Sequence, residues 1–559
     1  MSGKDKIDLI WPEGKEREQI EFSEEVIEDL DLKKIFRTPD IRLGRRADFN
    51  KIFRSIMNKC TSEEEVIQYR LNILEDLMNC EELVQAFEEI LSLVLNLRNI
   101  RDSQKKYESR LKNIVHRINE LEIYVECIEE LEQTFRKLSE PLQSSGIRKL
   151  RNKIEEISGH REYQSLKDEL PGMRKKIESL RSITIGINLD AQLNPREAVL
   201  VSINEEPYTT STFFDKLLKF DEDEFKGLAS LASGDRKSEA FNKKILDKIE
   251  ETMKSSIRAI VPTIEKYINV NTRFLMELRS GLLFYLSLLR LVKHIEKLGL
   301  PVCKPEVIGE DQKKGVIRDT YNINLAFEQK KEQGEIDIVK NDLEFGEEGR
   351  IFVLTGPNQG GKTTFTQAAG ITQVLFQLGV YVPGSEAEIS PVSGIYTHFP
   401  AEEKLASNLG RLGEECDRLK KIINSADENS LILLNESLAS TSPQEALYIA
   451  RETLMVFKVM GARVIFATHF HKLAENLKEM NSKVPGEAKI VSLVAGMDPD
   501  TSERTFEIKP GSPPGLSYAR DVADKLGVNF EDMVAVLKKR GVIDGPAEEY
   551  DLPIEDLDW

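Results

Sequence analysis

Residues 351–365 constrain the fold more than any other stretch, because they read IFVLTGPNQGGKTTF, an apolar run followed by a glycine-rich turn, a lysine and two threonines. Gly356, Gly361, Lys362 and Thr363 match the spacing G-x-x-x-x-G-K-[ST] of a phosphate-binding loop. Glycines let successive backbone N–H groups surround a phosphate, and the helix that follows adds the positive end of its dipole. The stretch therefore predicts a buried strand, a phosphate-binding loop and a helix.

A loop of this kind predicts ATP and Mg²⁺ as ligands. Lys362 would reach the β- and γ-phosphates, and the hydroxyl of Thr363 would ligate Mg²⁺. The alternative interpretation is a glycine turn that precedes a helix and carries a lysine by chance. The residues of the loop expected to bind ATP are Gly356, Pro357, Asn358, Gln359, Gly360, Gly361, Lys362, Thr363 and Thr364.

Two later apolar runs, LILLNES and VIFATHF, predict buried strands that end in polar residues. A hydrolysing P-loop protein places a metal-binding acid and a water-polarising glutamate at such a strand end. We therefore expect Glu436 to orient the attacking water. Asn435 stands where the acid would be, so we expect it to bind Mg²⁺ weakly together with Thr363, and turnover to be slow. His469 would sense the γ-phosphate, or is simply a hydrogen-bonded histidine at a strand end.

Hydrophobic periodicity divides the 559 residues into segments of different kinds. Spacings of three and four predict a helical core that begins near Ser62, and then long paired helices between about Asn99 and Arg181, with breaks at Pro141 and at Pro171-Gly172. Period-two alternation in SITIGINLD and AVLVSINEE predicts a small β-module. Helices return before Pro301, short polar strands follow, and strands and helices then alternate in the α/β manner.

The formal net charge of −18 argues against a broadly basic surface, so any contact with nucleic acid must come from local groups. Two basic groups lie close in sequence to the period-two strands and are candidates for binding DNA phosphates, although a solvated helix face is the alternative interpretation. Their members are Arg148, Lys149, Arg151 and Lys153, and Arg174, Lys175 and Lys176.

The five scattered cysteines predict reduced thiols, and the longest apolar run is too short to cross a membrane. We therefore expect a cytoplasmic protein without membrane contact, and DNA binding through the basic groups would associate it with the nucleoid.

With TGPNQGGKTTF, LILLNES, FATHF and Ser517-Tyr518, the chain resembles the MutS family of DNA mismatch-repair ATPases. The resemblance covers roughly Ser62–Val542 and is strongest over Phe352–Phe470. It implies a homodimeric clamp in which ATP binding and hydrolysis are coupled to holding mismatched, double-stranded or branched DNA during repair or recombination.

The resemblance has departures. The family usually has TGPNMGGKST, so Gln359 and Thr363 differ mildly, and its Asp-Glu strand end is here Asn435-Glu436. Counted without gaps, the family's Ser-Thr signature, which reaches the γ-phosphate of a dimer partner, falls on Gly410-Arg411. Arg411 could supply that contact in trans as an arginine finger. An unrelated surface arginine is the alternative.

The segment before the helical core is too short for the N-terminal mismatch-reading domain of full-length repair members, and the segment after Val542 is too short for a nuclease-like tail. We therefore expect a short member that recognises the shape of DNA. A weakly hydrolysing, ATP-gated scaffold without direct mismatch recognition is the alternative function. A small-molecule kinase is disfavoured, because Glu436 and His469 occupy the positions of a hydrolase.

The expected fold is multidomain, with an all-α core, long lever helices and a small β clamp module before an α/β P-loop ATPase domain of the ABC type. The expected boundaries are 1–45 for an acidic lead-in with at most one short helix, 46–98 for the first part of the core, 99–181 for the outgoing levers, 182–235 for the clamp module, 236–300 for the returning helices, 301–515 for the ATPase domain, and 516–559 for C-terminal helices, dimerisation and an acidic tail.

Overall fold

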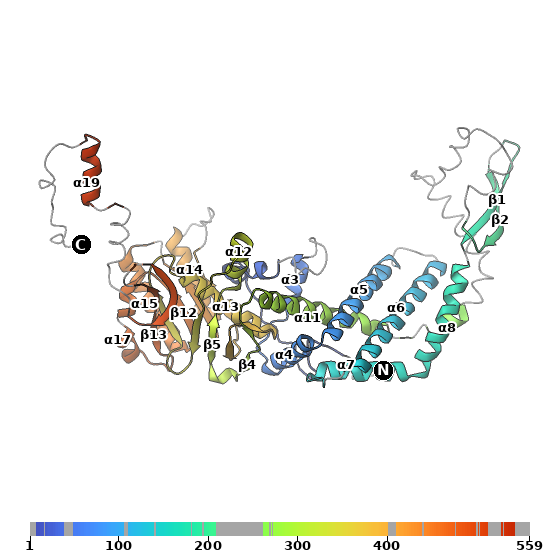
Figure 1. Ribbon diagram of the computed structural model, residues 1–559, viewed down its shortest axis with the longest axis horizontal. Coiled ribbons are helices and arrows are strands. Elements are labelled where there is room, and N and C mark those ends of the chain that lie inside the picture. Colours follow the sequence, from blue (N-terminus) through green and yellow to red (C-terminus); the bar gives the residue numbers. More distant parts are fainter. Residues whose placement is uncertain are drawn as a thin grey trace. The chain divides into compact units, whose positions relative to one another are not determined.

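The computed structural model contains helices and strands in two packed units (Figure 1). One unit comprises Met1–Gly14 and Asn72–Leu289, and the other comprises Lys15–Leu71 and Arg290–Trp559. The residues that the structure describes are 7–15, 17–37, 49–104, 110–138, 141–179, 181–192, 195–207, 261–267, 270, 272–400, 410–438, 441–475, 477–498, 501, 503–512, 527–528 and 530–542.

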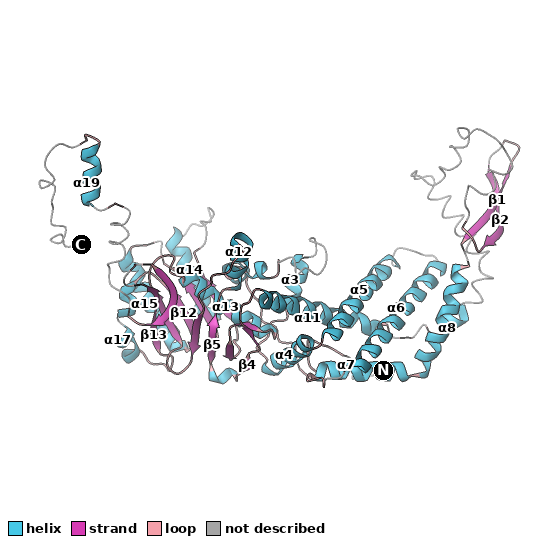
Figure 2. Ribbon diagram, viewed as in Figure 1, coloured by secondary structure: helices cyan, strands magenta, loops and turns pink. Residues whose placement is uncertain are grey.

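The larger unit is built round a six-stranded sheet with the strand order β10-β11-β12-β7-β13-β14. All neighbouring strands are parallel except the edge strand β14, which is antiparallel to β13. Strands and helices alternate after β7, as the sequence predicts (Figure 2). The strands are β7 (Ile351–Thr355), β10 (Ile395–His398), β11 (Leu431–Asn435), β12 (Arg463–Ala467), β13 (Ile490–Met497) and β14 (Arg504–Pro510).

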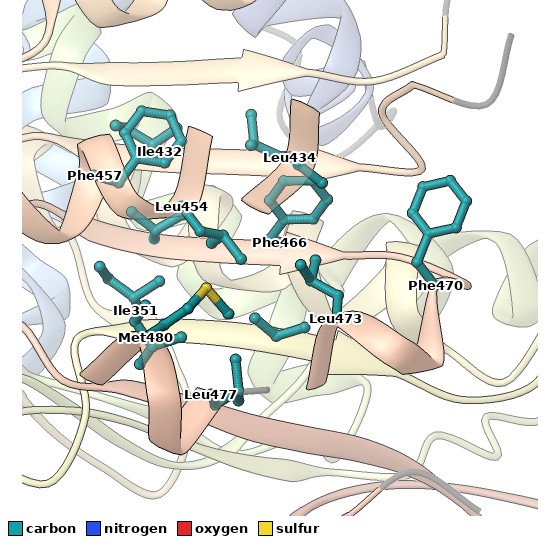
Figure 3. Close-up of a cluster of buried hydrophobic side chains, with 14 of the residues drawn as sticks. Ile351, Ile432, Leu434, Leu454, Phe457, Phe466, Phe470, Leu473, Leu477 and Met480 are labelled. Atoms are coloured by element: carbon teal, nitrogen blue, oxygen red, sulfur yellow. The ribbon is translucent and has the colours of Figure 1, made fainter. Parts of the chain in front are cut away.

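Helices cover both faces of this sheet, which explains why β7, β11 and β12 are buried at every position. On one face, side chains of the central strands form a cluster with residues such as Phe457 and Met480 of the covering helices (Figure 3). The helix that follows the glycine-rich loop, α13, contacts β11 and β12. The helices are α13 (Lys362–Leu378), α14 (Gly410–Ser425), α15 (Pro443–Met460), α16 (His471–Glu475) and α17 (Leu477–Lys483), and α19 (Phe530–Lys539) lies later in the chain.

Smaller sheets precede and flank β7. A four-stranded sheet has the order β4-β9-β5-β6, and β3 pairs with β8. A helix, α12 (Ile323–Gln333), interrupts the segment for which the sequence predicted only short strands. The side chain of Asn322 caps its beginning and Gly334 ends it in a left-handed conformation. The strands are β3 (Val302–Cys303), β4 (Glu306–Val307), β5 (Gly315–Thr320), β6 (Asn341–Phe345), β8 (Val382–Pro383) and β9 (Glu386–Ile389), and a 3₁₀ turn spans Glu310–Gln312.

The segment Glu24–Ile35, here called the N-terminal strap, also packs in this unit, although it lies before the predicted helical core in the sequence. It forms two short helices, α1 (Glu24–Asp29) and α2 (Leu32–Ile35), so the prediction of at most one helix was wrong. Its Leu30 is fully buried, and a Cβ added at Gly370 of α13 would meet the Leu30 side chain at 2.7 Å. The glycine therefore lets the strap lie directly on the helix that follows the loop.

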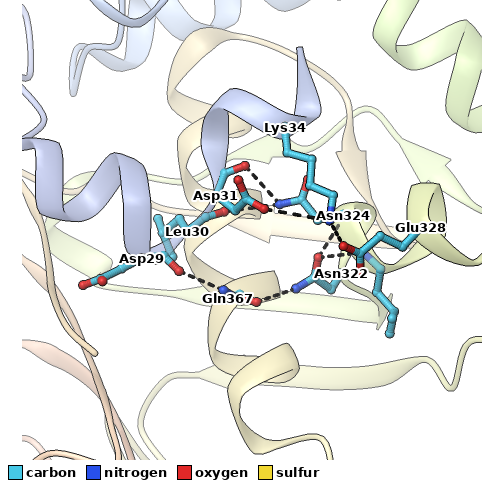
Figure 4. A network of polar contacts seen from close by, with 9 residues as sticks. Asp29, Leu30, Asp31, Lys34, Asn322, Asn324, Glu328 and Gln367 are labelled. Carbon is cyan, nitrogen blue, oxygen red and sulfur yellow. Dashed lines mark hydrogen bonds and ion pairs between the residues drawn. The ribbon is translucent and has the colours of Figure 1, made fainter. Parts of the chain in front are cut away.

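Hydrogen bonds hold the strap in place (Figure 4). Gln367 of α13 donates to the carbonyl oxygen of Asp29 at 2.8 Å, and Asn324 of α12 donates to the carbonyl oxygens of Leu30 and Asp31 at 3.3 and 3.2 Å. Asn322 in turn donates to Gln367 Oε1 at 3.1 Å. The network satisfies backbone carbonyls that are removed from water, which is the usual requirement for a buried chain segment.

The other unit is mainly helical, as the spacing of apolar residues predicts. Helix α6 contacts α5, α7, α8 and α10. Arg117 of α6 donates to the carbonyl oxygens of Tyr267 and Val270, both at about 3 Å, which fixes α6 against the returning chain. The helices are α5 (Glu81–Gln104), α6 (Arg110–Lys137), α7 (Ser145–Gly159), α8 (Arg161–Glu178) and α10 (Val261–Lys266). The division between the units falls within α4 (Glu64–Asn79) and α11 (Arg273–Lys297), and α3 (Phe49–Met57) belongs to the larger unit.

One expected break is absent from this unit. The chain is interrupted near Pro141, between α6 and α7, but α8 continues through Pro171-Gly172 without interruption. Pro171 lies on the exposed face of α8, where water can satisfy the carbonyl group that loses its backbone donor. The prediction of a break there was therefore wrong.

The two predicted period-two strands are confirmed. They are β1 (Ser182–Leu189) and β2 (Pro195–Asn204), and they pair antiparallel with register shifts near Ile185 and Leu189. Residues 208–260, which hold the rest of the expected clamp module and the start of the returning helices, lie outside the described residues, as do 513–526 with Ser517-Tyr518.

Each cysteine is a free thiol, as expected, and burial raises the pKa of Cys60 and of Cys127 to about 12. Among the helices of the described ranges, none combines the length and the apolar character needed to span a lipid bilayer.

Candidate active site

The glycine-rich loop between β7 and α13 depends on its glycines. Gly356 has φ 134° and Gly361 has φ 93°, values that residues with a side chain rarely adopt. A Cβ at Gly356 would meet the Cβ of Ala495 at 2.7 Å. Gln359 adopts φ 61° at an exposed position, and Arg504 donates to its Oε1 at 2.9 Å. The backbone shape expected of a phosphate-binding loop is therefore present.

Lys362 is the first residue of α13, and its side chain is only 3% exposed. Its Nζ donates to the carbonyl oxygens of Gly356 at 3.0 Å and Pro357 at 2.9 Å. Burial lowers the pKa of the Lys362 ammonium, and the carboxylate of Glu436 opposes that shift. The ammonium therefore lies inside the loop, where an anionic ligand would replace lost hydration.

Thr363 and Asn435, the two residues expected to bind the metal, are in contact. The Thr363 hydroxyl donates to Asn435 Oδ1 at 3.0 Å, and Asn435 is buried at the end of β11. In the part of the chain that the structure describes, no group of three or more acidic, histidine or cysteine side chains could enclose a metal ion. Two neutral oxygen ligands fit Mg²⁺, which keeps several waters and takes further ligands from substrate phosphates.

Glu436 and His469 follow adjacent parallel strands, so the sheet brings them to the edge where the loop also lies. Asn435 pairs with Ala467, and Ala467 pairs with Leu354, just before the loop. Glu436 is partly exposed, and its N–H donates to the Ala467 carbonyl at 2.8 Å. Partial burial lowers the pKa of His469, and the nearby carboxylate of Glu436 offsets only part of this shift. The imidazole is therefore neutral near pH 7.

A pocket of about 410 Å³ adjoins the loop. Lys362, Thr363 and Glu436 line one part of it. The rest is lined by other residues of the loop and of α13, by β5 and α12 and the residues between them, by residues 337–339, by the first residue of β6 and by one residue of β14. Phe506 of β14 is 45% exposed with φ 57°, and its carbonyl accepts from Asn341 Nδ2 at 3.1 Å. The wall residues absent from the sequence predictions are Thr320, Tyr321, Asn322, Leu325, Gln329, Asp337, Ile338, Val339, Asn341, Phe365, Ala368 and Phe506.

Most of these wall residues carry no motif of their own. Asn322 could have been found, because an asparagine before an apolar helical pattern that stops at a glycine is a capping signal. Arg411, expected to act in trans, is exposed in the first turn of α14 and does not line the pocket.

The basic residues expected to contact DNA differ in their surroundings. Four pair with carboxylates of the same unit: Lys149 with Glu13 at 3.0 Å, Arg151 with Glu155 at 3.7 Å, Lys153 with Glu156 at 2.8 Å, and Arg174 with Glu122. Arg148 donates to the Leu142 carbonyl at 3.2 Å. Lys175 and Lys176 are exposed in the last turn of α8 and form no ion pair with the described residues. These two lysines are thus the most available of the seven.

A glycine-rich loop after a central parallel strand, with polar residues at the ends of neighbouring strands, defines a P-loop nucleotide-binding domain. The comparisons with known proteins extend this assignment. The family described as MutS domain V matches residues 352–528, and the family described as MutS2 N-terminal domain matches residues 62–298. The chain belongs to the MutS family.

Curated relatives match over part of their length. A DNA mismatch repair protein MutS of Chlorobium phaeobacteroides is 31% identical over 250 residues, which cover 43% of this chain and 27% of that protein. An Endonuclease MutS2 of Thermomicrobium roseum is 32% identical over 217 residues, which cover 39% of this chain and 26% of that protein. The matches therefore span about a quarter of each relative.

Proposed function

We propose that this protein is a DNA-binding ATPase that acts as a dimeric clamp in mismatch repair or recombination, and that ATP binding and hydrolysis control its hold on structured DNA. The observation that supports the ATPase part best is the meeting of Lys362, Thr363 and Glu436 at one pocket, with Asn435 hydrogen-bonded to Thr363. Membership of the MutS family and the names of the relatives support the DNA part.

In this proposal the loop N–H groups and Lys362 bind the phosphates of ATP. Thr363 and Asn435 would hold Mg²⁺, which when bound neutralises charge on the phosphate oxygens. Glu436 accepts a proton from the attacking water or orients it, and neutral His469 donates a hydrogen bond toward the γ-phosphate. The exposed ring of Phe506 offers a face on which the adenine base can stack.

The DNA contact that we propose is to phosphates, through Lys175 and Lys176 and, where their ion pairs open, through Arg148, Lys149, Arg151, Lys153 and Arg174. Phosphate contacts position a protein on DNA without reading bases. Such a clamp would respond to the shape of a branch or a junction. We further propose a homodimer in which Arg411 reaches the partner's nucleotide, acting in the cytoplasm at the nucleoid.

The test of this function is fluorescence-anisotropy binding to homoduplex, single-mismatch duplex and four-way junction DNA at two salt concentrations, with and without ATP and Mg²⁺. Phosphate release is measured in parallel. We expect salt-sensitive binding that changes with nucleotide, and hydrolysis that depends on Mg²⁺. Hydrolysis without binding to any of the three DNAs would favour the alternative of an ATP-gated scaffold, which the uncharged Asn435 also favours.

Asn435→Asp is expected to tighten Mg²⁺ binding about tenfold and to increase turnover, because a carboxylate adds charge to the metal site while still accepting from Thr363. The measurement is the Mg²⁺ dependence of phosphate release. Asn435→Ala is the control, because it removes the acceptor altogether. Equal Mg²⁺ dependence in the Asp variant and the wild-type protein would show that Asn435 does not limit the metal site.

Lys175→Glu/Lys176→Glu is expected to weaken DNA binding and to reduce the slope of log affinity against log salt by roughly one for each lost phosphate contact. The matched control is Lys149→Glu/Lys153→Glu, because those lysines already pair with Glu13 and Glu156. Anisotropy titrations of both variants over a salt series provide the measurement. A larger loss in the control would assign the DNA contact to α7.

A further inference from the structure

A buried polar pair lies next to the proposed catalytic carboxylate. His398 ends β10, and Ser437 follows Glu436 beyond the end of β11. Each side chain is only 1% exposed. Ser437 Oγ lies 2.8 Å from His398 Nδ1 and 3.2 Å from the His398 carbonyl oxygen. The pair therefore joins the ends of two adjacent parallel strands.

The backbone on both sides of Ser437 is unfavourable. Glu436 has φ 48° and Leu438 has φ 69°, and neither is glycine. Left-handed conformations of such residues persist only where surrounding contacts hold them, and they are common at functional sites. The N–H of Glu436 is held by Ala467, and Leu438 is fully buried. The Ser437 side chain supplies the remaining fixed point, through His398.

The pair does not itself line the pocket, whereas Glu436 does. His398 is also neutral near pH 7, because burial and the neighbouring Arg418 lower its pKa to about 4. A neutral imidazole and a hydroxyl can form this hydrogen bond with either group as the donor. The pair can thus act on the site only through the backbone that carries Glu436.

We propose that His398 and Ser437 are positioning residues for ATP hydrolysis: their hydrogen bond holds the left-handed turn that directs Glu436 into the pocket. This inference rests on the proposed function, because Glu436 is the catalytic carboxylate in that proposal. Loss of the pair leaves the phosphate-binding loop intact. It therefore lowers the rate of the chemical step and not the affinity for ATP.

The first test is Ser437→Ala, compared with Ser430→Ala at the other end of β11. Ser430 is equally buried and hydrogen-bonds with Asp427 and Ser393. Removing its hydroxyl is therefore expected to cost a comparable amount of stability next to the same strand. We expect kcat of Ser437→Ala to fall about tenfold while KM for ATP stays within about twofold, by analogy with residues that orient catalytic ligands. Ser430→Ala should retain both constants.

The second test uses His398. The amide of Asn lies about where Nδ1 lies in histidine, so His398→Asn is expected to retain most of kcat, whereas His398→Leu should lose it as Ser437→Ala does. Unchanged kcat in Ser437→Ala, or equal losses in the Asn and Leu variants, would overturn the inference while the ATPase proposal stands. A wild-type protein that does not release phosphate would overturn both.

Discussion

Lys362→Ala is expected to lose ATP binding, the largest loss of nucleotide affinity of any single substitution that we predict. The ammonium is the only cationic side chain that lines the described pocket, and it lies within 3.0 Å of two loop carbonyl oxygens. Removing a buried charged donor costs about 3 kcal/mol, or roughly a hundredfold in affinity. Isothermal titration calorimetry with ATP and Mg²⁺ provides the measurement.

The control for this prediction is Lys458→Ala. Lys458 is likewise buried, at 4% exposure, its Nζ donates to the carbonyl oxygens of Gly486 and Ala488, and burial lowers its pKa. It does not line the pocket. We expect both variants to lose thermal stability, but only Lys362→Ala to lose ATP binding. Full affinity in Lys362→Ala would mean that this loop does not bind the nucleotide.

Glu436→Gln is expected to bind ATP normally but to hydrolyse it about a thousandfold more slowly, because the amide keeps the shape of the side chain and cannot accept a proton from water. The partly exposed carboxylate lies beside Lys362 and Thr363 in the pocket, so its position suits this role. Single-turnover phosphate release separates the chemical step from binding and release of product.

The same variant should accumulate the ATP-bound form, which size-exclusion chromatography in ATP can detect as a stable dimer if nucleotide holds two chains together. Glu436→Asp tests whether the carboxylate must extend as far as it does in glutamate to orient the attacking water, because aspartate keeps the charge and shortens the side chain. Parental rates in both variants would remove Glu436 from the chemistry and with it the basis of the positioning role of His398.

Each predictable part of the site lies next to a local sequence pattern. The loop, Asn435, Glu436 and His469 each lie at or just beyond the end of an apolar run, so one local pattern predicts both the strand and the residues at its end. Parallel pairing then brings the carboxyl ends together without further information. Sequence patterns could therefore indicate the edge of the sheet at which the candidate site lies.

The pocket wall and the pair behind Glu436 were not predictable in this way. Phe506 lines the pocket in a left-handed backbone conformation, and its carbonyl oxygen accepts a hydrogen bond from Asn341, which lies 165 residues earlier. Ser437 is hydrogen-bonded to His398, which lies 39 residues earlier. Contacts between residues so far apart in the chain depend on the tertiary fold, and no periodic pattern in the sequence indicates them. Pro171 shows the same limit, because its tolerance in α8 depends on which helix face is exposed.

The strap also sets the order in which this chain can fold during synthesis. Gln367, which binds the Asp29 carbonyl, lies 338 residues downstream. At 5–20 residues per second the ribosome exposes the strap for roughly 20–70 s before its partner appears. During that time Leu30, Leu32 and Ile35, all buried in the finished protein, lack their final contacts. The strap therefore completes its packing only after α12 and α13 have been synthesised, although it is made well before either helix.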